Sequence, residues 1–340
     1  MSRYAASHVS TQGPGDARPT ALQIVEDEGL TGKLVDKVFL VTGVSSGIGI
    51  ETLRALYATG AHVYGTVRDM DKGEEVVRDI KAKGQGGEIT LIPMEMDSLA
   101  SIKKGAEQFL SQSKQLNGLI GNAGGSVMAT PYGKTQDGFE TQFGTNHIGH
   151  FYLFQLLKHA LLDSSTPEFP SRVVSVSSMG HRCGEVRFDD YNFEDPDTYE
   201  AWTAYGQAKT ANIYFANEIE RRYGARGLHA TSLHPGGIAT ALQRHLDPEL
   251  LKGWANDEIT RYMKSPEQGA ATTVYAALSK EWANKGGKYL SNCVEQPAFD
   301  APDGPLSLKS DGYERWAYDE EKASRLWRDS LRMVGLEDEA

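Results

Sequence analysis

The sequence is poor in cysteine and has no long apolar run. Its 340 residues include only two cysteines, Cys183 and Cys293, too few for a disulfide framework or a cysteine-based metal cluster. Two reduced thiols are typical of a cytoplasmic protein. No apolar run approaches the roughly 18–20 residues that span a bilayer, and residues 1–20 lack the apolar core of a secretory signal. We therefore expect a cytoplasmic protein with no membrane anchor and no bound metal.

Positive charge is also scarce. The chain has 35 Lys and Arg against 46 Asp and Glu, for a formal net charge of -11. Nucleic-acid-binding proteins normally carry a basic stripe, so this balance argues against a nucleic-acid partner. Residues 295–340 hold 12 acidic and 6 basic residues, more than half of the net charge. The net charge therefore says little about a site in the body of the chain.

What the sequence has in quantity is short apolar runs that alternate with helix-periodic stretches. The runs cover 37–43, 62–67, 89–96, 116–121, 172–176 and 229–233, and the helical stretches cover 49–59, 71–83, 99–113, 138–162 and 203–223. Repeated strand–helix–strand units form parallel sheets through right-handed crossovers. We predict an α/β fold, a single Rossmann-like, doubly wound domain over residues 37–294, with helices on both faces of its parallel sheet.

The two ends of the chain depart from this alternation. Residues 1–36 predict an N-terminal arm, flexible over 1–20, followed by a short helix capped by Thr20. Residues 295–340 predict an acidic C-terminal extension with a terminal helix over 313–334.

Residues 236–265 also depart from the alternation, because apolar side chains are scattered among polar ones there. They are consistent with a surface helix pair that has one buried stripe, or with an apolar lid over a substrate, and the lid is our prediction. Ser265, Pro266 and Gln268 then supply an N-cap, a first-turn proline and a capping box, so a helix is expected to restart at that point.

The first strand leads directly into a glycine-rich loop, Thr42–Gly49. Gly43, Gly47 and Gly49 follow a G-x-x-x-G-x-G spacing. Glycines let the backbone turn tightly and let a pyrophosphate approach a helix N-terminus, where free N–H groups and the helix dipole favour anions. A glycine cluster alone is weak evidence. Its position after the first strand of an alternating fold is what predicts a dinucleotide site.

The end of the second strand indicates which dinucleotide binds. An NAD site carries an acid there for the ribose 2′-hydroxyl, whereas NADP sites use a cation for the 2′-phosphate. Val67 stands where the acid is expected, and Arg68 follows it with a donor fork suited to phosphate. The alternative is that Arg68 forms a solvated pair with Asp69. We predict NADP(H).

Tyr205 and Lys209 are four residues apart in a helical stretch and share a face. Chance alone gives about 0.8 such pairs in a chain of this composition, and Tyr318 with Lys322 forms a second one. Context separates the two pairs. Before Tyr205, a buried strand ends in Ser178 at the sheet edge that binds ligands. A nearby ammonium lowers the pKa of a phenol, which makes Tyr205 the candidate acid and base.

Asn146 is a further candidate, because it lies inside an apolar helical stretch. A buried amide in such a stretch needs a hydrogen-bonding reason to be there.

These residues resemble the short-chain dehydrogenase/reductase family. The motifs run in the family's order over residues 37–293: the loop Thr42–Gly49, Asp97, the run Gly121–Gly124, Asn146, Ser178, Tyr205 with Lys209, and Pro235–Gly236 with Thr240. Within the family the chain looks most similar to the branch of retinol dehydrogenases and WW-domain oxidoreductases, and to fungal oxidoreductases.

The resemblance implies a role for each matching residue. Tyr205 is the general acid/base, Lys209 lowers its pKa and binds the nicotinamide ribose, Ser178 orients the carbonyl and Asn146 holds a water in the proton relay. Arg68 takes the 2′-phosphate. The implied cofactor contacts are Gly43, Ser45, Ser46, Gly47, Ile48, Gly49, Asp97, Asn122, Ala123, Gly124, Pro235, Gly236, Ile238 and Thr240.

The chain also departs from the family pattern. Gly121 replaces the first asparagine of Asn-Asn-Ala-Gly, which leaves Asn122 but is expected to loosen packing on the adenine side. From residues 1–36 we expect no N-terminal anchor of the kind found in many retinol dehydrogenases, which puts a retinoid role in doubt. Beyond Ser178, His181 and Cys183 are expected to be structural, and Arg182 or Arg187 could attract an anionic substrate.

The sequence predicts an NADPH-dependent reductase that transfers a hydride to the carbonyl of a lipophilic small molecule. Alcohol oxidation and a non-redox cyclisation or isomerisation in natural-product biosynthesis stay open, because the same acid/base group serves each. A sensor that binds NADP(H) without turnover is a third alternative, disfavoured by the intact set of catalytic residues. A homodimer is compatible with each of these hypotheses.

Overall fold

The chain folds around one eight-stranded sheet. A computed structural model describes residues 2–124, 128–239, 256–300 and 304–338. The strands are β1 (Val38–Thr42), β2 (His62–Val67), β3 (Glu88–Pro93), β4 (Gly118–Gly121), β5 (Ser171–Val176), β6 (Leu228–His234), β7 (Lys288–Ser291) and β8 (Val294–Glu295). Their order is β3-β2-β1-β4-β5-β6-β7-β8, and only β7 and β8 pair antiparallel. The winding changes direction between β1 and β4, where such sheets bind ligands beyond their carboxyl ends.

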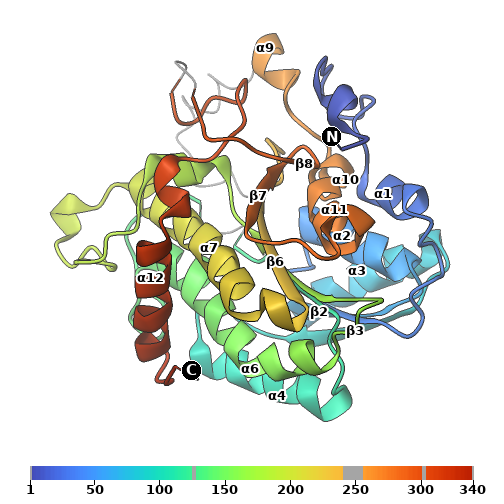
Figure 1. Ribbon diagram of the computed structural model, residues 1–340, viewed down its shortest axis with the longest axis horizontal. Helices are drawn as coiled ribbons and strands as arrows, with labels where there is room; N and C mark the ends of the chain where they lie inside the picture. The colour runs from blue at the N-terminus through green and yellow to red at the C-terminus, as the bar shows by residue number, and fades with distance from the viewer. Residues whose placement is uncertain (1, 125–127, 240–255, 301–303, 339–340) are drawn as a thin grey trace.

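Helices cover both faces of the sheet (Figure 1). One face carries α1 (Ala21–Asp27), α2 (Ile48–Ala58), α3 (Met70–Lys83), α10 (Pro266–Gly269) and α11 (Ala271–Leu278). The other carries α4 (Leu99–Gln112), α6 (Gly149–Asp163), α7 (Ala201–Tyr223) and α12 (Glu320–Met333). The predicted doubly wound α/β fold is therefore confirmed.

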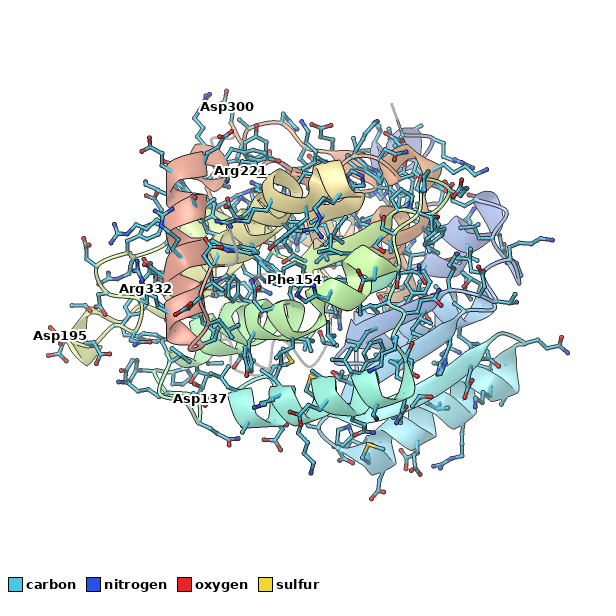
Figure 2. The ribbon with its side chains drawn as sticks, turned by 60° about the horizontal axis from the view of Figure 1, so that its bottom comes forward. Asp137, Phe154, Asp195, Arg221, Asp300 and Arg332 are labelled. Carbon is cyan, nitrogen blue, oxygen red and sulfur yellow. The ribbon has the colours of Figure 1, made fainter. Side chains whose placement is uncertain are left out.

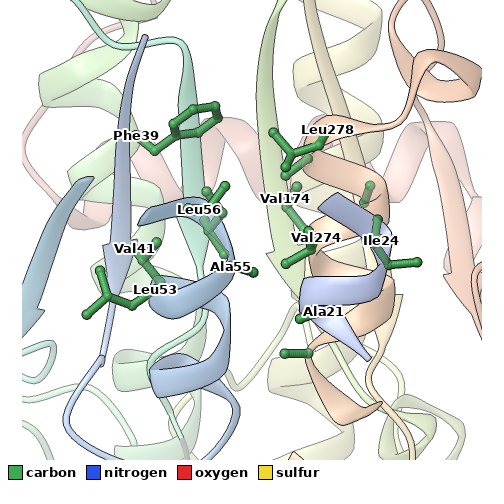
Figure 3. Close-up of a cluster of buried hydrophobic side chains, with 14 of the residues drawn as sticks. Ala21, Ile24, Phe39, Val41, Leu53, Ala55, Leu56, Val174, Val274 and Leu278 are labelled. Carbon is green, nitrogen blue, oxygen red and sulfur yellow. The ribbon is translucent and has the colours of Figure 1, made fainter. Parts of the chain in front are cut away.

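The core on the α2 side is made of aliphatic side chains from helices and strands. Figure 3 shows Leu53 and Leu56 of α2 beside Val41 of β1, and Ile24 of α1 beside Val274 of α11. All five side chains are fully or almost fully buried. Burying an aliphatic side chain of this size contributes about 1.5–3 kcal/mol, so α1 is held to the domain although it precedes the first strand.

The core on the opposite face is aromatic and includes the C-terminal helix. Trp327 of α12 lies with its ring centroid 5.1 Å from Phe151 and 6.0 Å from Phe154, and 6.3 Å from Phe215 of α7. Phe154 lies in the interior between these helices in Figure 2. The C-terminal extension is thus packed into the body of the domain.

Local sequence signals set several helix starts. The Thr20 side chain accepts a hydrogen bond from Gln23 N and starts α1, and Asp69 caps α3 by accepting from Lys72 N. Ser265 and Gln268 form the predicted capping box, with Pro266 at the start of α10. Each such cap is worth about 1 kcal/mol.

The predicted helix over 138–162 is interrupted in the structure. It consists of α5 (Thr141–Phe143), a π-helical turn over Gly144–Ile148, and α6. Gly149 N donates to Gly144 O across five residues, the hydrogen bond that defines the wider turn. Such turns often occur at functional sites, and this one contains Asn146.

Other expectations differ from the structure at the edges of the fold. Strands β7 and β8 were not predicted, because they are short and Asn292 and Cys293 between them adopt left-handed backbone angles (φ 54° and 57°). The sheet therefore extends to Glu295, one residue past the expected domain limit. Residues 240–255, the main part of the predicted lid over 236–265, lie outside the described residues.

The N-terminal arm, expected to be flexible over 1–20, packs against the domain. Arg18 is 3% exposed. Its guanidinium donates to the carbonyls of Gly13, Tyr262 and Met263 and to the carboxylate of Asp16. A buried guanidinium needs acceptors for its five donors, and here the chain before α10 supplies two of them.

Candidate active site

The glycine-rich loop forms a cradle at the carboxyl end of β1. Gly43 and Gly47 have φ of 73° and 58°, left-handed angles that favour glycine, and Gly47 immediately precedes α2. A Cβ on Gly49 would lie 2.1 Å from Gly43 O, so only glycine allows the loop to fold this closely. The free N–H groups of α2 then face the loop, which fits a pyrophosphate.

Asn122 braces this loop from the end of β4. Its side-chain amide donates to Thr42 O at 2.9 Å and to Gly43 O at 3.2 Å. Its backbone N–H and that of Ala123 both donate to Thr42 Oγ1 at 2.9 Å. The sequence assigned Asn122 to the adenosine ribose region. The structure also gives it a bracing role that determines the shape of the loop.

The replacement at Gly121 does not leave a gap in the packing. A Cβ at this position would lie 3.1 Å from Cδ2 of His150, so the imidazole occupies the adjoining space. The expected loosening on the adenine side is therefore not seen at this position.

Arg68 and Asp97 follow β2 and β3 at the same sheet edge. Arg68 is exposed and Asp97 is half-buried, and both line the cavity that contains the glycine loop. Asp69 caps α3 and lies 3.5 Å from Lys72. Arg68, exposed and lining the cavity, lies at its rim just beyond the end of β2.

Tyr205, Ser178 and Lys209 meet in that cavity. Tyr205 and Lys209 lie on α7, and the Lys209 ammonium is 5.6 Å from the centroid of the Tyr205 ring. Ser178 follows β5, and its hydroxyl accepts a hydrogen bond from Gly180 N at 3.0 Å. Lys209 Nζ donates to Val176 O at 3.2 Å, which orients the side chain from the end of the same strand.

Burial controls the protonation of this group. It raises the pKa of Tyr205 to about 12, with a smaller opposite effect from its hydrogen bond to Ser178. It lowers the pKa of Lys209 to about 7. The expected lowering of the Tyr205 pKa is thus reversed in this structure, because desolvation disfavours the charged form of both groups. The phenol is protonated at neutral pH.

Asn146 lies behind the cavity wall. Its side chain is fully buried, and its amide donates to Gln142 O at 2.9 Å. A Cβ on Gly124 would lie 2.1 Å from Asn146 Oδ1, so Gly124 permits the amide to approach the cofactor loop. The Asn146 carbonyl oxygen accepts a hydrogen bond from His150 Nδ1 at 2.9 Å.

One cavity of about 1030 Å³ collects almost all the predicted site residues. Asn146 does not line it, and Thr240 lies outside the described residues. The predicted residues that line it are Gly43, Ser45, Ser46, Gly47, Ile48, Gly49, Arg68, Asp97, Asn122, Ala123, Gly124, Ser178, Tyr205, Lys209, Pro235, Gly236 and Ile238.

Part of the cavity lining is apolar, and sequence reasoning missed some of it. The walls of the cavity include Met128, Trp202, Tyr262 and Met263, together with the C-terminal segment 304–309. Lys309 Nζ in that segment lies 2.6 Å from Glu258 Oε1 on α9 (Asp257–Thr260). The available signal was the pair Leu306 and Leu308 in the polar stretch 300–312, which does not by itself indicate a cavity.

His181 and Arg182 hold the C-terminal segment in place. His181 Nδ1 is 2.6 Å from Ser178 O, and its Nε2 accepts from Glu314 N at 3.1 Å. Arg182 donates to the carbonyls of Ser310 and Gly312. The expected structural role of His181 matches these contacts. Arg182 is committed to backbone carbonyls, which disfavours it as an anion receptor, and burial raises the pKa of the Cys183 thiol to about 11.

The chain belongs to the short-chain dehydrogenase/reductase family. Residues 37–192 match the family described as short chain dehydrogenase. The family's members are oxidoreductases that use NAD(P)(H) and act on alcohol or carbonyl groups of small molecules.

Relatives fall in the branch that the sequence indicated. The chain is 51% identical to the short-chain dehydrogenase/reductase prx1 of Penicillium roqueforti, over 98% of this chain and 95% of that protein. It is 38% identical to human retinol dehydrogenase 11, over 77% of this chain and 79% of that protein. A crystal structure of a putative uncharacterized protein from Mycobacterium Paratuberculosis superposes with a TM-score of 0.64 at 31% identity, covering 94% of this chain and 97% of that one. Among the described helices, none has the length and apolar character needed to cross a membrane.

Proposed function

We propose that this protein is an NADP(H)-dependent reductase that converts the carbonyl group of a lipophilic small molecule to an alcohol. The observation that carries the proposal is the single cavity in which Ser178, Tyr205 and Lys209 lie together with the glycine cradle and Arg68. The glycine cradle, Arg68 and Lys209 are the residues that would hold a dinucleotide, which would supply the hydride.

The choice of NADP(H) rests on the end of β2. Val67 is 1% exposed and carries no charge, and exposed Arg68 follows it. With no carboxylate at the position expected to bind the 2′-hydroxyl, and a guanidinium beside it, the rim favours the 2′-phosphate.

The phosphate contact can be tested by replacing Arg68→Ala. Losing one charge-assisted phosphate contact is expected to raise the Kd for NADPH about 10- to 100-fold, on the basis of about 1.5–3 kcal/mol for such a bond, and to leave the Kd for NADH nearly unchanged. Fluorescence titration measures both constants. Arg78→Ala on α3, a surface position paired with Glu74, is the matched control. Equal effects of Arg68→Ala on the two cofactors would contradict the assignment.

The residues around Tyr205 suit the reductive direction. When bound, the nicotinamide supplies the hydride to the carbonyl carbon. The phenol of Tyr205 gives its proton to the carbonyl oxygen, so the π bond of the carbonyl is replaced by one C–H and one O–H bond while the C–O single bond remains. Ser178 holds that oxygen by a hydrogen bond, and the ammonium form of Lys209 stabilises the phenolate that Tyr205 leaves. A phenol that is protonated at neutral pH is prepared for this role.

The apolar lining of the cavity supports a lipophilic substrate. Met128 and Trp202 pack beside Tyr205, and Met263 lines the same cavity; pockets of this composition bind apolar ligands. The related retinol dehydrogenases are named for a lipophilic alcohol, which agrees with this substrate class.

A screen of NADPH oxidation with apolar aldehydes and ketones tests the proposal. Tyr205→Phe is expected to lower kcat by at least 100-fold, because general acid catalysis contributes about 10²–10⁴-fold, while NADPH binding is retained. Tyr318→Phe changes the other Tyr-x-x-x-Lys pair, outside the cavity, and is expected to keep its activity. Equal rates for wild type and Tyr205→Phe would refute the role of Tyr205.

A further inference from the structure

His150 connects two parts of the site that belong to different elements. It is the second residue of α6 and is 6% exposed. Its Nε2 lies 2.9 Å from Thr42 Oγ1 at the end of β1, and its Nδ1 lies 2.9 Å from the backbone oxygen of Asn146. One imidazole therefore touches both the strand end that begins the glycine loop and the π-helical turn that holds Asn146.

The partners of the ring determine its protonation. A carbonyl oxygen only accepts, so His150 Nδ1 carries a hydrogen and donates it to Asn146 O. In the neutral ring Nε2 is then an acceptor, and the Thr42 hydroxyl donates to it. Burial lowers the pKa of His150 to about 4, and Lys209 acts in the same direction. The ring is neutral at pH 7, which agrees with this assignment.

The Thr42 hydroxyl extends the connection to the end of β4. Its oxygen accepts hydrogen bonds from the backbone N–H groups of Asn122 and Ala123, each at 2.9 Å. The Thr42 hydroxyl hydrogen has two possible acceptors, His150 Nε2 at 2.9 Å and Ile120 O at 3.4 Å. The shorter contact to His150 leaves the oxygen of Thr42 directed toward the two amides.

Gly121 makes room for this arrangement. Its missing Cβ would lie 3.1 Å from His150 Cδ2, a distance that forces a neighbour to move by a few tenths of an ångström. A side chain at position 121 would therefore press the imidazole away from its two partners. Gly121 therefore leaves the imidazole free to reach both partners.

We propose that His150 is a positioning residue that couples the cofactor-binding loop, through Thr42, to the carbonyl of Asn146. Its Nε2 end sets the loop geometry and hence cofactor affinity. Its Nδ1 end binds the Asn146 backbone oxygen and so holds the π-helical turn that carries Asn146, whose proposed role is in turnover. The second effect rests on the proposed function, and the first does not.

Two substitutions separate the two ends of the ring. His150→Asn retains a donor near the position of Nδ1 and loses the reach to Thr42. His150→Gln retains an acceptor near the position of Nε2 and loses the donor to Asn146 O. We expect His150→Asn to raise the Kd for NADPH about tenfold with kcat within twofold, and His150→Gln to lower kcat about tenfold with Kd within twofold. Tenfold corresponds to about 1.4 kcal/mol, the size of one buried hydrogen bond.

His147→Gln is the matched control. His147 is also buried in the π-helical turn, but its Nε2 contacts Ser330 on α12, at 2.9 Å. Its replacement is expected to lower thermal stability without moving Kd or kcat more than twofold. If all three variants show the same uniform loss, His150 has only a structural role and the proposal is wrong.

A double-mutant cycle keeps the test decisive if a His150 variant folds poorly. Thr42→Val is expected to raise the Kd for NADPH in the wild type, and to raise it by a smaller factor in the His150→Asn background, since the bond between them is then already lost. Additive effects would overturn the coupling.

The tautomer gives a spectroscopic readout. Nitrogen-15 NMR of the labelled holoenzyme is expected to show His150 as the neutral Nδ1–H form at pH 7, and an Nε2–H form would overturn the hydrogen-bond assignment. Kd and the tautomer are measured without turnover. A failure of the proposed reductase activity would therefore leave the loop half of the proposal intact, whereas an unchanged Kd in His150→Asn would refute that half directly.

Discussion

Gly49→Ala is the perturbation whose size follows most directly from the structure. The added Cβ would lie 2.1 Å from Gly43 O and 2.7 Å from the side-chain nitrogen of Asn122. Both distances are far inside van der Waals contact, and one of the two atoms is backbone. The loop must therefore move away from α2, and the hydrogen bonds from Asn122 to Thr42 O and Gly43 O must lengthen.

Overpacking of this kind costs about 1–3 kcal/mol, and each weakened hydrogen bond adds about 1 kcal/mol. If the whole of this distortion, about 3–5 kcal/mol with both hydrogen bonds counted, falls on the bound state of the loop, the Kd for NADPH rises by roughly 100- to 4000-fold, at 1.4 kcal/mol for each factor of ten. Fluorescence titration of the folded variant measures this constant, and urea denaturation measures how far the substitution lowers the free energy of unfolding.

Gly84→Ala is the control for introducing a methyl group. Gly84 follows α3 with φ -171°, an extended angle, and a Cβ there meets nothing within 4 Å. The Gly84→Ala variant is expected to keep the wild-type Kd for NADPH and the wild-type free energy of unfolding. Wild-type affinity in Gly49→Ala, measured beside this control, would refute the close approach of the loop as the basis of cofactor binding.

Three further predictions concern stability. Burial lowers the pKa of His147 to about 3, of His150 to about 4 and of His181 to about 3, so protons bind first to the unfolded chain as the pH falls below 6.5. The free energy of unfolding is therefore expected to fall by up to about 4 kcal/mol per pH unit, at 1.36 kcal/mol for each of the three groups. Urea denaturation from pH 7 to pH 4.5 that shows no such fall would contradict the burial of these histidines. Arg18→Met is expected to cost about 3–5 kcal/mol because it leaves Asp16 without its buried partner, and a change below 1 kcal/mol in urea denaturation would show that the arm is not anchored by this residue. Trp327→Ala is expected to cost about 3–5 kcal/mol by opening a cavity among α6, α7 and α12, and a thermal midpoint equal to that of the wild type would show that α12 is dispensable.

The parts of the fold that the sequence predicts well are those in which local pattern and tertiary structure agree. Six strands were anticipated because each is a short apolar run; all but the edge strand β3 are almost entirely buried, and parallel strands covered on both faces need that pattern. Strands β7 and β8 were not predicted because they are short and are joined by two left-handed residues, Asn292 and Cys293, so that no periodicity develops.

Contacts between distant segments could not be predicted. Arg18 looked like one charge in a polar arm, and only the folded chain brings it to the carbonyls of Tyr262 and Met263. Similarly, Leu308 gave no sign that the C-terminal segment crosses back to the cavity. The spacing of residues in a sequence predicts which side chains are neighbours on one helix or strand. It does not predict where a segment distant in the sequence packs against the domain.

Some residues of the candidate site could be predicted from the sequence, and others could not. Ser178, Tyr205 and Lys209 could be assembled from the sequence because their elements end at one sheet edge. The bracing role of Asn122 and the two contacts of His150 could not, because they depend on side-chain directions across three elements. The direction of the Tyr205 pKa was also misjudged, since the charge of Lys209 was weighed without the desolvation that dominates both groups.

The proposed chemistry is tested most directly by following the hydride itself. NADPH with deuterium at both C4 positions is incubated with the enzyme and an apolar aldehyde that it reduces, and the product is examined by mass spectrometry and NMR. We expect one deuterium on the carbinol carbon, and at least a 100-fold slower appearance of this product with Tyr205→Phe. Alcohol that forms without deuterium, or at the same rate in both proteins, would contradict hydride transfer with Tyr205 as the proton donor.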